Sequence, residues 1–390
     1  MAGEMFAAGQ HPGIPQAAGH GAAIIRDGLH SLPIITAFRR AGKSIQHRRT
    51  VQVNTQCPQL TAHHTPNFVG VGGIARAGND HGAGKNRGFA AQAGNTAALL
   101  VDGDKIEKLN TKTKETISPL VYPSWHPSGK YVAFSVNTTK QAFHLNDRNR
   151  VEVYDETSDV VVYDVEKHEI VTASNIFSKD AFETFPTFSP DGKTLYFCTA
   201  EARPIPQEYS EVKYNLCSVS FDPVTRAFGA QVDTLYNAKS GGMSASFPRV
   251  SPDGRYLLYT LSGYGNFSIW HKEANLWLLD LTSGDLRELS EVNSDDTESF
   301  HNWSSNSRWF VFSSRRGDGL YTRLYLASMD ENGKISKPFL LPQEDTETYY
   351  DRSVYSYNVP DFTSEPIKID TRVFEKKITS KERIQVQAKK

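Results

Sequence analysis

The sequence predicts an all-β fold made of repeated four-stranded antiparallel sheets, and three observations support this prediction. First, one pattern occurs at residues 122–134, 185–197 and 247–259, with a divergent fourth copy at 300–310. Second, each copy places a tight-turn sequence between two short apolar stretches, as in a β-hairpin. Third, each copy is followed by another apolar stretch that ends at an aspartate, namely Asp164, Asp222, Asp280 and Asp330.

The turn at the centre of each copy has a clear physical basis. Proline presets the backbone for a turn, aspartate caps it, and glycine adopts the left-handed conformation. The fourth copy carries Ser307 where the others carry glycine, so we expect its turn to differ in type. The residues expected to shape the other turns are Pro127 and Gly129, Pro190, Asp191 and Gly192, and Pro252, Asp253 and Gly254.

The second half of each unit predicts two further strands. Third strands are expected at 160–163, 216–221, 276–279 and 324–327, each followed by a turn and a fourth strand. A fixed repetition of such four-stranded units is typical of a β-propeller. Residues 98–109 predict two more strands around an Asp-Gly turn, which would be the outer half of another unit. About four and a half blades are therefore recognisable, and we expect an incomplete propeller.

The chain divides into three parts. Residues 1–96 contain no Tyr and no Trp, although the whole chain has 17 and 5 of them, and they show no helical or strand periodicity. We expect an unstructured leader rich in Ala, Gly and His; the alternative is that this segment is not native coding sequence. The propeller is expected at 97–342. Residues 343–390 are expected to form an aromatic segment that packs against it, followed by a charged and frayed terminus.

Composition excludes several classes of function. A formal net charge of −1 gives no electrostatic reason to expect a nucleic-acid partner. No apolar run is long enough for a transmembrane segment. The first residues show no basic region followed by an apolar stretch, so no secretory signal peptide is visible.

The repeated pattern Pro-x-(Trp/Phe)-Ser-Pro-Asp-Gly-Lys-x-(Ile/Leu)-x-(Phe/Tyr) resembles the WD40-like PD40 repeat of TolB-type β-propellers, over roughly residues 97–342. Such propellers usually close with six or more blades, and the resemblance implies a location in the periplasm or cell envelope. Some PD40-containing relatives carry a Cys-x-x-Cys-His haem site. Residues 57–60 read Cys-Pro-Gln-Leu and do not continue that pattern, so we expect no haem and no other cofactor.

One face of the predicted propeller is more elaborate than the other. The turns between first and second strands are short and define a tight-turn face, whereas long connections at 137–158, 201–214, 262–274 and 314–322 define a long-loop face. Long ordered loops on a rigid scaffold concentrate binding residues, and arginine with aromatic residues is typical of recognition surfaces. The alternative is that these are solvated loop residues that pack on their neighbours. The expected contact residues are Phe143, His144, Arg148, Arg150, Asp155, Tyr209, Trp270, His271, Arg315 and Arg316.

These observations favour a non-catalytic binding module that engages a protein or glycan partner. The alternative is a metal-dependent polysaccharide lyase of the oligogalacturonate type, which some TolB-like propellers resemble. Its weak candidate ligands are His144, His271 and His301, none of which has a ligand partner close in sequence. A hydrolase is not expected, because residues 242–246 lack the second glycine of a nucleophile elbow. We therefore assign no catalytic residue.

Cys198 and Cys217 lie on the predicted strands that flank the long loop of the second copy. They are expected either to be two free, buried thiols or, in an oxidising compartment, to cross-link neighbouring strands.

Overall fold

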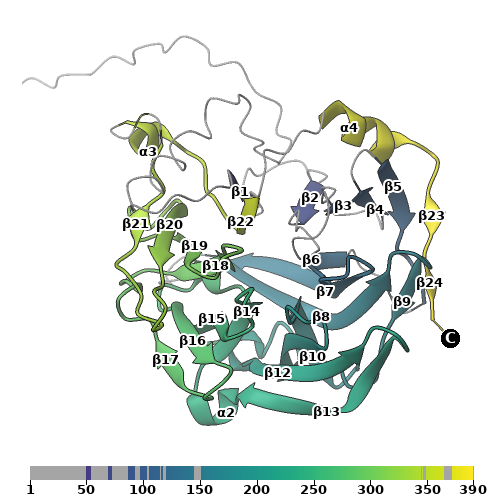
Figure 1. Cartoon of the computed structure of the whole chain (residues 1–390), viewed down its shortest axis with the longest axis horizontal. Helices are drawn as coiled ribbons and strands as arrows, with labels where there is room; N and C mark the ends of the chain where they lie inside the picture. The colour runs from purple at the N-terminus through teal and green to yellow at the C-terminus, as the bar shows by residue number, and fades with distance from the viewer. Residues whose placement is uncertain are drawn as a thin grey trace, which may run out of the picture.

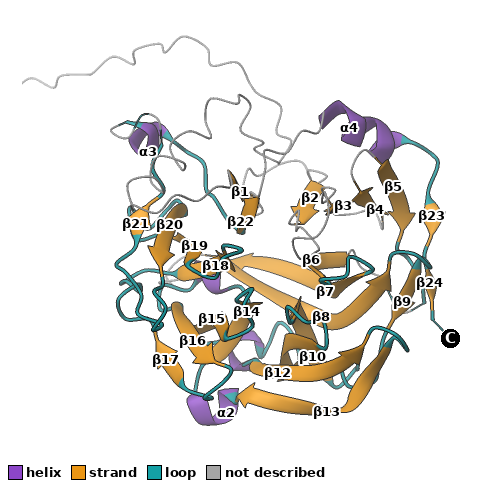
Figure 2. Ribbon diagram, viewed as in Figure 1, coloured by secondary structure: helices purple, strands orange, loops and turns teal. Residues whose placement is uncertain are grey.

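The computed structural model describes residues 50–53, 69–72, 87–92, 97–102, 105–114, 116, 120–144, 151–343, 345, 348–363 and 371–389. Within this part of the chain the strands form six sheets, which are arranged around a ring (Figure 1). The helices of the described residues are short (Figure 2). The architecture is mostly β and propeller-like, as the sequence predicts.

We call each sheet a blade and number the blades in chain order. Blade 1 contains β2 (Val69–Gly72), β3 (Arg87–Gln92), β4 (Ala97–Asp102) and β5 (Lys105–Asn110). Blade 2 contains β6 (Leu120–Trp125), β7 (Tyr131–Phe143), β8 (Val151–Asp164) and β9 (Glu169–Val171). Blade 3 contains β10 (Ala181–Phe188), β11 (Thr194–Glu201), β12 (Asn215–Asp222) and β13 (Ala227–Tyr236).

Blade 4 contains β14 (Ser244–Val250), β15 (Tyr256–Ser262), β16 (Asn275–Asp280) and β17 (Leu286–Glu288). Blade 5 contains β18 (Glu298–Trp303), β19 (Trp309–Ser314), β20 (Arg323–Ser328) and β21 (Phe339–Leu340). Blade 6 is described by β22 (Pro360–Thr363), which pairs with β1 (Thr50–Val53). The short helices are α2 (Ala238–Gly241), α3 (Tyr349–Arg352) and α4 (Thr371–Thr379).

The first strand of each blade lies nearest the centre of the ring. β6, β10, β14, β18 and β22 contact one another in succession, whereas later strands pair outward in chain order. Blades bury both of their faces against their neighbours, which is why a strand such as β15 is buried at every residue. Cys198 and Cys217 are free and buried, and they belong to core clusters on opposite faces of blade 3. This arrangement agrees with two free thiols rather than with a cross-link.

The tight turns repeat one backbone geometry. Gly129, Gly192 and Gly254 have φ values of 71°, 73° and 77°. Ser307 has a φ of 56°, and its N–H donates to the carbonyl of the residue three positions earlier, as in the other three turns. The prediction that the fourth turn differs in type was therefore wrong. Serine tolerates the left-handed conformation here because its hydroxyl accepts a hydrogen bond from the N–H of Asp253, at 3.0 Å.

A second backbone feature repeats in the innermost strands. Tyr122, Phe185, Phe247, Phe300 and Val359 have positive φ values of 54°, 52°, 53°, 47° and 48°. Where the first two strands of a blade pair, the register shifts at this residue, which marks a β-bulge. A positive φ is costly for bulky residues. Its recurrence at equivalent positions indicates that the fold requires it.

The bulges direct four aromatic rings toward the centre of the ring. Ring centroids are 4.5 Å apart between Tyr122 and Phe185, and 3.9 Å apart between Phe185 and Phe247. Phe300 lies 4.5 Å from Phe247, while Tyr122 of blade 2 comes within 5.8 Å of Phe247 of blade 4. Rings from non-adjacent blades can meet only near the axis. We call these four residues the aromatic plug.

The C-terminal segment contributes to the ring. Residues 359–362 repeat the Pro-x-Phe part of the pattern and begin blade 6, a copy that the sequence reading did not recognise. β23 (Ile384–Gln385) and β24 (Gln387–Ala388) pair in parallel with β5 and β9, and so add a fifth strand to blades 1 and 2. Val386 between them is 1 % exposed. The expectation of a frayed terminus after residue 368 is therefore wrong for residues 371–389.

The leader is described only in part. β1, β2 and β3 fall within the 1–96 segment that was expected to be unstructured, so that expectation does not hold for these three stretches. The other residues of the leader lie outside the described residues. Among the helices that the structure describes, none has the length and apolar character to cross a bilayer.

Candidate functional site

The longest connection on the long-loop face is a hairpin rather than a loop. β7 and β8 continue beyond the rest of blade 2 as an antiparallel pair, from Asn137 opposite Ser158 to Phe143 opposite Val151, with one register shift between Thr138 and Thr139. We call residues 137–144 and 151–158 the arm. Figure 1 shows the arm reaching from blade 2 toward the middle of the ring. The run of β-branched and aromatic residues in β8 favours strand over loop.

Asp155 joins the two strands of the arm and anchors the arm to blade 4. Its carboxylate accepts hydrogen bonds from Nδ2 of Asn137 at 2.7 Å and from Oγ1 of Thr139 at 2.6 Å, both on β7. It also accepts one from Nδ2 of Asn266 at 2.6 Å, which lies in the β15–β16 connection of blade 4. Burial raises the pKa of Asp155 to about 6, although the three hydrogen bonds act in the opposite direction. Asp155 is 4 % exposed and therefore holds the arm rather than a partner.

Glu152 makes the second connection between the arm and blade 4. It is 2 % exposed, and its Oε2 accepts a hydrogen bond from the hydroxyl of Tyr264 at 2.7 Å. Nε2 of His144 lies 3.6 Å from Oε2, and Nε2 of His271 lies 4.0 Å from Oε1. Burial raises the pKa of Glu152, while the Tyr264 hydroxyl and the two histidines oppose this shift.

His271 is positioned by a second carboxylate. Its Nδ1 lies 3.0 Å from Oε1 of Glu273. Burial alone would raise the pKa of Glu273, but the hydrogen bond from His271 and backbone N–H groups lower it to about 2. His271 itself is 2 % exposed, so it contributes to the anchoring of the arm and not to an open surface.

Blade 3 contacts the other side of the arm through stacked aromatic rings. Tyr209, in the 3₁₀ turn Tyr209–Glu211, stacks against Tyr154 with a centroid distance of 5.6 Å. It also stacks against His144 at 6.2 Å, and its edge meets Tyr264 at 5.7 Å. The arm is therefore held by loops of blades 3 and 4 together.

The structure places the expected contact residues in different surroundings. Phe143, at the end of β7, is 51 % exposed, and Arg148 and Arg150 lie outside the described residues. Arg315 stacks over Trp270 with its guanidinium carbon 4.7 Å from the ring centroid, and Nη2 donates to the carbonyl of Gly319. The expected residues that the arm brings together are His144, Asp155, Tyr209 and His271.

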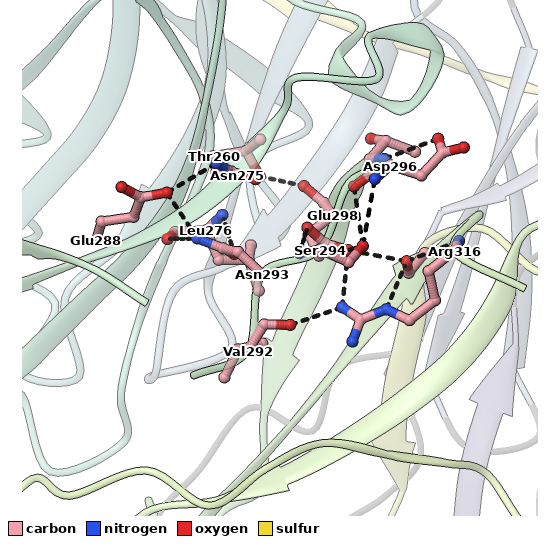
Figure 3. Close-up of polar contacts among 12 residues, drawn as sticks. Thr260, Asn275, Leu276, Glu288, Val292, Asn293, Ser294, Asp296, Glu298 and Arg316 are labelled. Carbon is pink, nitrogen blue, oxygen red and sulfur yellow. Dashed lines mark hydrogen bonds and ion pairs between the residues drawn. The ribbon is translucent and has the colours of Figure 1, made fainter. Parts of the chain in front are cut away.

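Arg316 belongs to the interior. Its Nη2 lies 2.7 Å from Oε1 of Glu298 and donates to the carbonyl of Val292, also at 2.7 Å (Figure 3). Glu298 is 0 % exposed, and hydroxyls of Ser294 and Ser314 donate to the same oxygen. Burial raises the pKa of Glu298, while Ser294 and Arg316 oppose this shift. Arg316, one of the expected contact residues, is therefore engaged by the protein itself through Glu298 and the carbonyl of Val292.

The weak metal candidates do not converge. His144 and His271 approach the same carboxylate, but His301 lies in β18 and its Nε2 is 2.9 Å from the carbonyl of Leu258. Burial lowers the pKa of His301 to about 3. Among the residues that the structure describes, no three His, Cys, Asp or Glu side chains are arranged to hold a metal ion. We therefore derive no metal-dependent step.

Sequence reasoning did not select Tyr154, Asn266 or Glu298, each of which contacts an expected site residue. Of these three, only Glu298 could have been recognised from the sequence. An acidic residue two positions before the aromatic of an innermost strand, as Glu298 is before Phe300, is expected to be buried and therefore to need a counter-charge or a proton.

No family model matches the sequence, and no curated protein matches it. Solved structures with a similar fold include TolB from Acinetobacter baumannii, at 16 % identity and a TM-score of 0.42, over 70 % of this chain and 54 % of that one. An oligogalacturonate lyase in complex with manganese matches at 15 % identity and a TM-score of 0.39, over 69 % and 68 % of the two chains. A prolyl endopeptidase matches at 15 % identity and a TM-score of 0.41, over 66 % and 35 %.

These neighbours have different functions, so the similarity does not identify the function of this chain. The sheets, bulges and turns of the chain itself define its architecture. Its structural neighbours are TolB and TolB-like propeller proteins.

Proposed function

We propose that this chain is a β-propeller binding module of the periplasm or cell envelope, which engages a protein or glycan partner through its long-loop face without catalysing a reaction. The observation that carries the proposal is the anchored arm. Glu152 and Asp155 fix it to blade 4, and Tyr209 fixes it to blade 3. The location follows from the resemblance of the repeats to TolB-like propellers.

The anchoring suits recognition because it prepares the arm before a partner arrives. A segment held in its bound conformation loses less entropy on association than a mobile loop does. The tip of the arm carries Phe143, whose exposed ring can be buried by a partner. Arg148 and Arg150 follow it in the sequence and add charge for a polar or acidic partner.

The polar groups beneath the tip are better suited to structure than to chemistry. Asp155 has three donors and Glu152 has the Tyr264 hydroxyl and two histidines. Both carboxylates are buried and their partners come from the protein itself. A substrate would have to displace these contacts to reach either group.

The test compares capture by the full chain with capture by arm-tip variants. The immobilised protein is exposed to an envelope extract of the source cells, with F143A/R148A/R150A as the test variant. Phe339→Ala is the matched control, because Phe339 is also an exposed phenylalanine, at 37 %, on the outer strand β21. We expect the triple variant to lose capture at least about tenfold with an unchanged melting temperature. Equal capture by the triple variant and the wild type would refute the proposal.

Treatment of the extract with protease or with periodate then distinguishes a protein partner from a glycan partner. The lyase alternative is favoured only by the approach of His144 and His271 to Glu152. The lyase alternative predicts two results. The wild type should cleave polygalacturonate, and it should contain a bound metal that the Glu152→Gln variant lacks. Both results together would replace the binding proposal.

A further inference from the structure

One position in the innermost strands lies between the aromatic plug and the tight-turn face. It is the second residue after each positive-φ residue, where strand pairing resumes beyond the bulge. Because the first strands surround the axis, the side chains at this position form a ring. We call it the axial ring, and it consists of Ser124, Thr187, Arg249, Asn302 and Asp361 from blades 2 to 6.

Contacts between blades place these side chains around the axis. Nδ2 of Asn302 donates to Oδ1 of Asp361 at 2.8 Å, which links blades 5 and 6. The Ser124 hydroxyl accepts from the N–H of Phe188 at 3.2 Å, which links blades 2 and 3. The charge of Arg249 on blade 4 acts on Asp361 of blade 6 across the intervening blade. This charge effect between non-adjacent blades indicates that both side chains point toward the axis.

Most side chains of the axial ring are partly rather than fully exposed. Ser124, Arg249, Asn302 and Asp361 all keep intermediate exposure. Phe247, two residues before Arg249, is 2 % exposed, and the other rings of the plug pack on it. The plug thus lies on one side of the axial ring, and we infer that a ligand would approach the ring from the other side, toward the tight turns.

The chemistry of the axial ring favours an anion. Among the described residues, Arg249 makes one side-chain hydrogen bond, from Nη1 to the carbonyl of Pro248 at 3.0 Å, and no described carboxylate lies within ion-pair distance. A guanidinium offers five N–H donors and keeps its charge, so the others remain for a ligand. Oδ1 of Asp361 already accepts from Asn302 and from the N–H of Phe362.

Asp361 adds its full opposing charge only above about pH 7. Burial raises its pKa to about 7, while the N–H of Phe362 and the charge of Arg249 act in the opposite direction. Burial lowers the pKa of His301 to about 3, so this neighbour is neutral. Below about pH 7 the axial ring therefore combines one positive charge with hydroxyl, amide and mostly protonated carboxyl groups.

We propose that the axial ring binds a carboxylate, carried by a small acid or by the C-terminal end of a peptide, which enters from the tight-turn face. The guanidinium of Arg249 takes the carboxylate with two parallel hydrogen bonds. Asn302, Asp361 and Thr187 provide donors and acceptors for a polar group beside it. The site lies on the face opposite the arm, and it does not depend on the proposed function.

The experiment measures binding to the full chain by calorimetry and ligand-observed NMR. The probes are lactate, N-acetyl-trialanine with a free carboxylate, and the same peptide as its C-terminal amide. We expect at least one carboxylate probe to bind and the amide to fail, because it cannot form the charged pair. Binding of lactate alone identifies a small acid, and binding of the peptide acid alone identifies a chain end. Absence of binding by both acids at millimolar concentration would overturn the proposal.

Variants of Arg249 then locate the site. R249Q should weaken binding at least about tenfold, and R249K should have an intermediate effect because lysine keeps the charge and loses the bidentate geometry. Arg255→Gln is the matched control, since Arg255, in the turn just before β15, pairs with Asp280 at 3.1 Å. If R249Q binds as the wild type does, the proposal is wrong. Should R249Q fail to fold, Asn302→Ala replaces it, with weaker binding expected and wild-type affinity counting against the site.

The two proposals fail separately. R249Q should still capture the partner of the arm, and F143A should still bind the carboxylate probes. Loss of carboxylate binding in F143A would place the site on the wrong face and overturn the axial assignment.

Discussion

Replacing Arg316 with alanine should destabilise the whole fold, because it leaves Glu298 buried without a counter-charge. Glu298 is 0 % exposed, and Arg316 is the cation at 2.7 Å. Removing one partner of a buried ion pair costs about 3–5 kcal/mol. The hydroxyls of Ser294 and Ser314 and the N–H of Ser294 remain in place, so we expect a loss near the lower end, about 3 kcal/mol. In a domain of this size that corresponds to a fall of about 6–12 °C in Tm.

Urea denaturation of the full chain measures this loss, and two further variants test its cause. The double variant R316A/E298Q should recover part of the stability, because a neutral amide does not need the counter-ion. Arg203→Ala is the control: Arg203 pairs with Glu201 at 3.2 Å on the surface, and its loss should cost less than about 0.5 kcal/mol. If R316A keeps the wild-type unfolding free energy yet loses partner capture, the reasoning is wrong and Arg316 is a contact residue.

Three other changes test the rest of the structure. Asp155→Ala removes the acceptor that Asn137 and Asn266 share and leaves Asn137 only a longer bond to Thr184, so hydrogen exchange across the arm should rise about 100-fold while exchange in the other blades stays constant. Burial and the nearby charge of Asp159 raise the pKa of Glu183 from 4.5 to about 8, so its contribution to stability is present below pH 4.5 and is lost as pH rises through 8. Urea titrations should show the wild type losing about 2 kcal/mol more than Glu183→Gln between pH 6 and 8.5. Deletion of residues 384–390 uncovers the edges of β5 and β9, and it should lower Tm and increase light scattering, whereas deletion of Lys390 alone should not.

The parts of the fold that the sequence predicts well are those determined by local chemistry. The Pro-Asp-Gly turns and the strands that end at Asp164, Asp222 and Asp280 are where the residues place them, because turn propensity acts within a few positions. Blade 6 escaped recognition because Val359 replaces the aromatic of the pattern, and no Ser-Pro-Asp-Gly follows Phe362. The bulge persists there because the backbone geometry, and not the ring, is what the copies share.

The candidate site was harder to predict because it depends on contacts between blades. The expected loop at 137–158 is an extension of the predicted strand at 160–163, and its alternating β-branched residues could have indicated this. Nothing in the sequence joins Asp155 to Asn266, which are 111 residues apart, or separates Arg315 on the surface of Trp270 from Arg316 inside blade 5. Two consecutive arginines therefore have different roles, and these roles can be told apart only from the residue that each contacts, Trp270 for Arg315 and Glu298 for Arg316.

The axial ring also depends on contacts between blades that the sequence does not predict, and the pH dependence of ligand binding tests it. Arg249 remains protonated, His301 is neutral because burial lowers its pKa to about 3, and burial raises the pKa of the Cys198 thiol, so it stays neutral too. Of the described groups that face the ring, Asp361 is therefore the one that titrates near pH 7. A bound carboxylate should be repelled as Asp361 ionises, by about 1 kcal/mol for like charges at close range, and affinity should fall about fivefold from pH 6 to pH 8. Calorimetry with the better carboxylate probe measures this change. Asp361→Asn should bind at pH 8 as tightly as the wild type does at pH 6, and an unchanged pH dependence in that variant would mean that the ligand does not meet Asp361 at the axis.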